Sequence, residues 1–326
     1  MLDILKNFLK IDALVGTLNR LPPLRSFMMD LVYPESVRWN HPFDRLVHSD
    51  LGLPTKNIPL VTRGSVSYAL TPDTTALKQI DPANITPSII VNASDLNRLR
   101  TLGLAQQQQW VDKKIDELRR TARKTTEAMA IQSITGKINY DIRGADGNID
   151  KYVVDYGTPE IVVLDKKWDA NGIKAGEVTA GVGQIMRSLK KTSDGTNIVH
   201  LINWDVYSAL VTIAASFNNP ELIKVFEDHV QIGNAKFLIC AAQYYDYKAK
   251  TYVDAVPAKH AVTLAIDDAF SLAYCALDSI DANFAALAFH VNQVKLDDPE
   301  SIKLIGQTRS MPIPNVSAIR KTQVIS

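Results

Sequence analysis

Residues 94–134 read SDLNRLRTLGLAQQQQWVDKKIDELRRTARKTTEAMAIQSI, a stretch with no proline and a single glycine. Charged residues fill one side of it. At about 1.5 Å per residue, a helix of this length reaches roughly 60 Å, which is longer than a small domain is wide. The stretch predicts one long amphipathic helix that must lie along the rest of the chain. Its apolar or small positions recur at spacings of three and four, the period of one helix face, at Val111, Ile115, Leu118, Ala122, Thr125 and Met129.

Three residues mark the expected limits of this helix. Ser94 is the expected N-cap, and Gly136 is the expected stop just beyond the C-terminal end. Gly103 marks either a bend or the true start, because glycine costs about 1 kcal/mol in a helix interior.

The first 93 residues have the opposite character. Nine of the 15 prolines lie there and leave no room for a long helix. The segment still keeps apolar and aromatic residues, unlike a disordered tail. Residues 61–70 and 85–91 are predicted as the two strands of an extended hairpin arm. Because an isolated two-stranded arm is marginal in water, we expect this quarter of the chain to become ordered only against sister copies.

Overall charge does not suggest a polyanionic partner held by bulk electrostatics. The 326 residues carry 36 Lys and Arg against 35 Asp and Glu, a net charge of +1. The basic cluster at 113–124 is interleaved with acids, so we interpret it as a solvated helix face with pairs such as Asp116 with Arg120. The two cysteines stand in apolar runs and are expected to be buried. No apolar run is long enough to cross a membrane.

Residues 151–326 alternate irregularly between short helical and extended patterns, which indicates an α+β fold rather than βαβ repeats. A hairpin is expected from 237–247 and 251–256. Helices are predicted at 175–191, from Asn203 and from Pro220, and strands at 197–202, 261–266, 285–291 and 317–324.

The chain shows no credible active site. His48, between Asp44 and Asp50, comes nearest to a metal cluster but stands in irregular, proline-rich sequence. Gly181 and Gly183 begin a GxGxxG pattern, yet Met186 occupies its third glycine position inside a helical stretch. We therefore predict a protein that is not an enzyme, with no catalytic, cofactor-binding or metal-binding residues and no cofactor.

Three stretches together carry a resemblance to a known family: IDALVGTLNRLPPLRSFMMDLVYPESVRW (11–39), WVDKKIDELRRTARKTTEAMAIQSITGKINY (110–140) and GQTRSMPIPNVSAIRKTQVI (306–325). The chain resembles the major capsid proteins of lambda-like tailed bacteriophages, the capsid protein E family, which have the Hong Kong-type capsid fold. The first stretch is similar to the family's N-terminal arm, the second to its spine helix and the third to its closing strand pair.

The resemblance implies a division of the chain and a role. It implies an N-terminal arm at 1–46, an extended hairpin loop at 47–93, a peripheral domain with the spine helix at 94–165 and 288–326, and an axial domain at 166–287. Copies would form hexamers and pentamers of an icosahedral shell around double-stranded DNA, without sequence-specific binding and without a membrane. The protein would be made in the host cytoplasm and reside in the virion.

The family also implies partners and contact residues. A separate scaffolding protein, a portal and possibly a decoration protein are expected. Some relatives join subunits through Lys–Asn bonds, for which Lys78 or, second, Lys56 would be the lysine. The candidates for inter-subunit contact are Arg63, Tyr68, Lys78, Trp39 and Phe43, and the candidates for proximity to DNA on the inner face are Arg119, Arg120 and Arg123.

Two alternatives remain beside the phage capsid. A non-viral nanocompartment shell would keep the fold and change the cargo, although the C-terminal stretch 306–325 favours the phage family. A DNA-binding or filament-forming protein would use the long basic helix and would show steep salt dependence of DNA binding.

Overall fold

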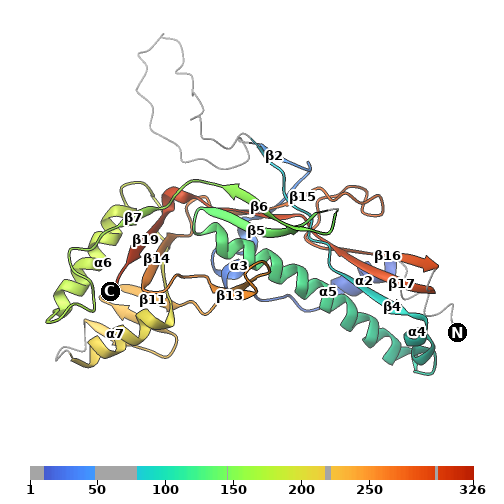
Figure 1. The fold of residues 1–326 in the computed structure, drawn as a ribbon, viewed down its shortest axis with the longest axis horizontal. Helices are drawn as coiled ribbons and strands as arrows, with labels where there is room; N and C mark the ends of the chain where they lie inside the picture. Colours follow the sequence, from blue (N-terminus) through green and yellow to red (C-terminus); the bar gives the residue numbers. More distant parts are fainter. Residues whose placement is uncertain (1–10, 48–78, 145, 217–221, 298–299) are drawn as a thin grey trace, which may run out of the picture.

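The computed structural model describes residues 11–47, 79–144, 146–216, 222–297 and 300–326. The molecule is elongated (Figure 1). The long helix α5 (Leu104–Ser133) runs from its middle towards one end, and a large sheet with helices α6 (Ala175–Leu189) and α7 (Trp204–Ser216) forms the other end. Helices and strands mix irregularly along the chain, so the predicted α+β class is confirmed.

The predicted apolar stripe of the long helix is confirmed, with one correction. Val111, Ile115, Leu118, Ala122 and Met129 are buried. At the fifth position the buried residue is Thr126, whose hydroxyl lies 2.6 Å from the Ser310 hydroxyl, while Thr125 is half-buried. The sequence 122, 126, 129 keeps the helical spacing, so both positions satisfy the period and only the neighbouring strand distinguishes them.

A single helix over 94–134 is the wrong prediction. The chain forms α4 (Ala93–Arg100), in which Asn92 rather than Ser94 occupies the N-cap position without a side-chain capping bond, and then begins α5 with Gly103 at its N-cap position. Gln107, 2% exposed, closes the break, because its side-chain amide donates to the carbonyl oxygens of Leu99 (3.1 Å) and Leu102 (3.0 Å). Gly103 is therefore the true start of the long helix.

The large sheet has seven strands of mixed direction. Its helices α6 and α7 bury Val178, Val182, Ile185, Val206 and Leu210 in one apolar cluster with Trp168 and Phe237. The strands in spatial order are β7 (Glu160–Val162), β19 (Ile319–Gln323), β14 (His260–Ala265), β8 (Ile198–Ile202), β11 (Ala235–Ile239), β10 (His229–Ile232) and β9 (Ile223–Val225).

A three-stranded sheet lies along α5 at the other end of the molecule. It has the order β16 (His290–Asp297), β17 (Glu300–Gln307), β4 (Ser88–Asn92). The strand predicted at 85–91 thus exists but pairs with β17, and its predicted hairpin partner at 61–70 lies outside the described residues.

Smaller sheets complete the body. Two sequence predictions are corrected here: 237–247 divides into separate strands β11 and β12, and after the undescribed residues 217–221 the chain forms strand β9. These sheets are β1 (Arg38–His41) with β15 (Ser271–Cys275) and β18 (Ser310–Ile313), β2 (Leu46–Val47) with β3 (Gln79–Ile80), β5 (Lys137–Arg143) with β6 (Ile149–Asp155), and β12 (Gln243–Asp246) with β13 (Thr251–Asp254).

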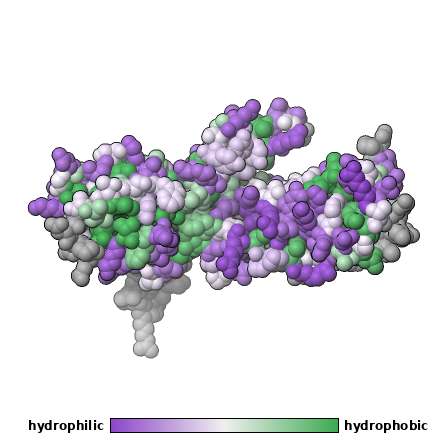
Figure 2. Space-filling model, turned by 90° about the horizontal axis from the view of Figure 1, so that it is seen from below, coloured by the Kyte–Doolittle hydropathy of each residue, from purple (hydrophilic) through white to green (hydrophobic). Residues whose placement is uncertain are grey.

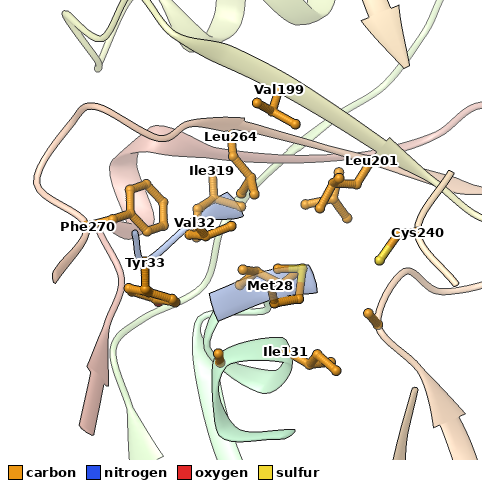
Figure 3. Packing of buried hydrophobic residues seen from close by; sticks show 14 of the residues in the cluster. Met28, Val32, Tyr33, Ile131, Val199, Leu201, Cys240, Leu264, Phe270 and Ile319 are labelled. Carbon is orange, nitrogen blue, oxygen red and sulfur yellow. The ribbon is translucent and has the colours of Figure 1, made fainter. Parts of the chain in front are cut away.

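The N-terminal segment at 11–47, which we call the arm segment, packs against its own chain. It contains helices α2 (Ile11–Arg20) and α3 (Phe27–Leu31). Figure 3 shows Met28, Val32 and Tyr33 packed between the end of α5 and the sheet. Their exposed fractions are 0%, so the expectation that this part of the chain is sheltered only by sister copies is wrong for residues 11–47.

Gly136 ends α5 as predicted, with a φ of +82° and its N–H donating to the Ser133 carbonyl oxygen at 2.9 Å. A Cβ there would lie 2.1 Å from the Gly157 carbonyl oxygen. We expect Gly136→Ala to lower the free energy of unfolding of the unassembled subunit by about 2–4 kcal/mol, from left-handed strain and overpacking.

Denaturant titration measures this loss. The control is Gly183→Ala in α6, where an added Cβ meets nothing within 4 Å and should raise stability by about 0.5–1 kcal/mol. Equal effects of the two substitutions would contradict the assignment of Gly136 as an obligatory glycine.

Candidate assembly surfaces and the contacts that position them

The arm segment is held to α5 by the half-buried carboxylate of Glu127. Glu127 accepts hydrogen bonds from the backbone N–H groups of Met28 (2.7 Å) and Met29 (2.9 Å), in the first turn of α3. These N–H groups have no partner inside their own helix, so the carboxylate supplies what the short helix lacks. Burial raises the pKa of Glu127 despite these bonds and the nearby Arg123, because loss of water is the largest effect.

Two arginines extend this contact. Arg123 of α5 donates to the Ser26 hydroxyl (2.7 Å) and to Asp30 (2.7 Å). Arg38 also reaches Asp30 (3.1 Å) and donates to the carbonyl oxygen of Met29 (2.9 Å). Both guanidinium groups are mostly shielded from water, with 14% and 13% of the side chain exposed, whereas their shared partner Asp30 keeps 42% of its side chain exposed.

The three arginines predicted near DNA therefore divide into two kinds. Arg119 donates to the Pro22 carbonyl oxygen (2.6 Å) and pairs with Asp116. Arg123 binds Ser26 and Asp30 of the arm segment. Arg120 shares Asp116 at 2.5 Å, as predicted, and keeps 64% of its side chain exposed. Of the three, Arg120 is the one open to a partner on this face.

Strand pairing joins the two ends of the segment that lies outside the described residues, and a buried arginine lies beside the end that follows it. Strands β2 and β3 pair just before and after residues 48–78, and their Leu46 and Ile80 are buried. Arg309, with 8% of its side chain exposed, donates to the Pro82 carbonyl oxygen (2.8 Å) and pairs with Asp81 and Asp278. This stem fixes where the segment leaves and rejoins the body.

Of the predicted inter-subunit contact residues, only Trp39 and Phe43 lie within the described residues. Arg63, Tyr68 and Lys78, with Lys56, lie outside the described residues. Trp39 is half-buried and begins an edge-to-face row of rings with His41 and Phe43, at centroid distances of 5.2 and 5.5 Å. Phe43 is 66% exposed, as a contact residue would be.

Two exposed apolar features were missed at the sequence level. The loop between β15 and β16 presents Ile280 (80% exposed) and Phe284 (60%), with Phe284 at a φ of 54°. Helix α7 buries one face but also exposes Trp204 (55%) and Val211 (36%). The sequence of α7, WDVYSALVTIAAS, has a single charged residue, and this apolar character all round could have indicated a second buried face.

Aromatic residues extend the apolar surface of α7. Tyr207 stacks edge-to-face with Trp204 at 5.5 Å and donates its hydroxyl to the Phe226 carbonyl oxygen (2.8 Å). Phe226, 43% exposed, stacks on His229 at 4.4 Å. We call Trp204, Tyr207, Val211 and Phe226 the α7 face. Figure 2 shows hydrophobic surface at the end of the molecule where α7 lies.

The described residues offer little for small-ligand chemistry. Among them, no group of three or more His, Cys, Asp or Glu side chains could hold a metal ion. Within the same residues, no helix is long and apolar enough to span a membrane. Cys240 and Cys275 are both buried and are not joined by a disulfide bond, in line with their apolar sequence surroundings.

An elongated α+β subunit with a long helix, an arm segment and an exposed apolar face on α7 has the features expected of a shell-forming structural protein. The family model for phage major capsid protein E matches residues 10–324, and the chain belongs to this family. It is thus a structural capsid protein, and the family match makes the nanocompartment alternative the weaker one.

Solved structures have the same fold. A protein assigned as the capsid protein of a prophage in E. coli CFT073 has a TM-score of 0.62 at 14% identity, covering 98% of this chain and 99% of the other. A phage-related protein from Bordetella bronchiseptica RB50 has a TM-score of 0.51 at 9% identity, with 96% of both chains covered. None of the curated protein sequences matches this chain.

The hydrogen bonds of Glu127 predict that replacing its carboxylate by an amide lowers the free energy of unfolding. In Glu127→Gln one of the two N–H groups of α3 faces an amide NH₂, so we expect a loss of about 1–3 kcal/mol in the free energy of unfolding. The control Glu117→Gln removes an exposed pair with Lys114 on the same helix and should cost less than about 1 kcal/mol.

The pH dependence of this difference has a definite sign. Since burial raises the folded-state pKa of Glu127, protonation favours the folded protein. The stability advantage of wild type over Glu127→Gln should be greatest below the ordinary glutamate pKa and should shrink as pH rises through the folded-state pKa. An advantage that grows with pH would contradict the buried setting of Glu127.

Arg309 provides a test of the stem. Arg309→Met leaves the carbonyl oxygens of Pro82 and Ala276 without a partner, and we expect a loss of about 1–3 kcal/mol in the free energy of unfolding. Arg45→Met removes a 54% exposed side chain whose pair with Asp81 is 3.8 Å long, so it should cost less than about 1 kcal/mol. Denaturant titration compares the two, and equal losses would mean that the stem does not depend on Arg309.

Proposed function

We propose that this chain is the principal subunit of the icosahedral shell of a tailed bacteriophage, assembled as hexamers and pentamers around double-stranded DNA. It is made in the host cytoplasm and resides in the virion, with a separate scaffolding protein, a portal and possibly a decoration protein as partners. The division into arm, extended loop, peripheral domain and axial domain belongs to the same proposal.

The observation that carries the proposal is the α7 face. Helix α7 has one charged residue and exposes a tryptophan and a valine beside the exposed Phe226. Removing such a surface from water costs little desolvation free energy. Aromatic residues of this kind are enriched where protein surfaces meet. The α7 face lies within residues 166–287, the proposed axial domain, where copies would meet around a symmetry axis.

Exposed Phe43, Ile280 and Phe284 support a second contact surface. The backbone N–H of Ala276 donates to the Phe43 carbonyl oxygen at 3.1 Å, so the arm segment and the loop between β15 and β16 are joined at this point. Both Asn283 and Phe284 have positive φ values, a conformation that costs a non-glycine residue energy. A contact with a neighbouring subunit would offset this strain.

Electron microscopy of the purified full chain tests the proposal. Closed particles of uniform diameter support a shell, and filaments would refute it. A filament-forming protein, the alternative from another class, would be recognised in the same images.

A substitution in the α7 face should separate folding from assembly. Val211→Glu places a charge in the proposed contact, and we expect folded subunits with unchanged circular dichroism that form at least tenfold fewer particles. Val211→Thr keeps the size of the side chain without a charge and should assemble like wild type. Normal assembly of Val211→Glu would show that the α7 face is not an interface.

A further inference from the structure

A groove with an excess of positive charge runs between the arm segment and α5. It has a volume of about 900 Å³, is open to solvent and lies between residues 22–26 and the middle of the helix. Five basic and two acidic side chains line it, a net charge of +3, whereas the whole chain has a net charge of +1. We call it the basic groove. Figure 2 shows hydrophilic surface across the middle of the molecule, where α5 lies.

The cations of the basic groove form a row with one residue opposite. Lys113, Arg120 and Lys124 follow each other at spacings of seven and four on one face of α5, so they extend over about 16 Å. Arg25 faces them from the arm segment. All four residues are exposed to solvent.

Most of this charge is not neutralised within the subunit. Arg25, Lys113 and Lys124 form no ion pair with any residue that the structure describes. The two acids of the groove are already engaged, since Asp116 pairs with Arg119 and Arg120, and Glu117 pairs with Lys114 at 3.1 Å. The uncompensated cations therefore favour an external polyanion.

We propose that the basic groove binds the phosphate backbone of the double-stranded DNA enclosed by the shell, an inference that rests on the proposed function. Lysine and arginine contacts to phosphate need no base sequence and no apolar anchor. Every side chain that α5 contributes to the groove is polar or charged. An acidic peptide helix would need apolar anchor sites on that wall, so the observations favour DNA.

The proposal changes which residues of the long helix meet DNA. Arg119 and Arg123 hold the arm segment, so they build the groove rather than bind in it. Arg120 remains, and Arg25, Lys113 and Lys124 join it.

The test uses the full chain as purified subunits and a random-sequence DNA duplex. The variant Arg25→Gln, Lys113→Gln, Lys124→Gln removes three charges and leaves the Asp116 pairs intact. The control Lys224→Gln, Lys236→Gln, Lys248→Gln removes three charges from exposed lysines on other elements. Each protein is titrated with DNA at several salt concentrations, and its assembly is followed by electron microscopy.

The expected result is a loss of salt dependence in the groove variant alone. With four phosphate contacts, wild-type affinity should fall roughly 100-fold between about 50 and 200 mM salt, and with one contact only roughly 4-fold. The control variant should behave like wild type, and all three proteins should still form shells.

Three other results would overturn the inference. They are an unchanged salt slope in the groove variant, an equal loss in the control variant, and an effect of the groove variant on polyglutamate binding but not on DNA binding. If shells form in any of these cases, the proposed function stands and only the groove assignment fails. If wild type forms filaments instead of shells, the proposed function fails whatever the salt slopes.

Discussion

The structure depends on burial of the arm segment against α5. A helix of 30 residues has more apolar surface than one neighbouring sheet can cover, and the sheet of β16, β17 and β4 covers only one end of it. Met28, Met29, Val32 and Tyr33 cover the other end together with the large sheet. Because Glu127 and Arg123 supply the polar contacts of the same segment, the helix, the arm segment and the large sheet are stabilised as one unit.

The long helix could be predicted well, because the residue spacings and types that define it all lie within its own sequence. The buried positions from Val111 to Met129, the stop at Gly136 and the pair of Asp116 with Arg120 all follow from spacing and residue type. The break at Gly103 was foreseen only as one of two readings. Whether Gly103 bends a helix or starts one depends on the side chain of Gln107. Its hydrogen bonds to the carbonyl oxygens of Leu99 and Leu102 do not follow from helical periodicity.

Long-range strand pairing could not be predicted from local patterns. Strand β4 pairs with β17, more than 200 residues away in the chain, and no periodicity in either strand identifies the other. The roles of Arg119 and Arg123 were likewise hidden, since a charged helix face looks the same whether it meets water, DNA or an arm. The sequence of α7 indicated an exposed apolar face, because it has only one charged residue. Which residues form that face became clear only when the structure showed which side of the helix is buried.

The stem of β2 and β3 has a consequence for how this protein can vary. Neighbouring strands lie about 4.8 Å apart, so the chain leaves and re-enters the body at practically one point. The length of what lies between is then decoupled from the body, since doubling a closed segment costs only about 0.6 kcal/mol of chain entropy. A change in the number of residues between Val47 and Gln79 would therefore leave the packing around Arg309 untouched.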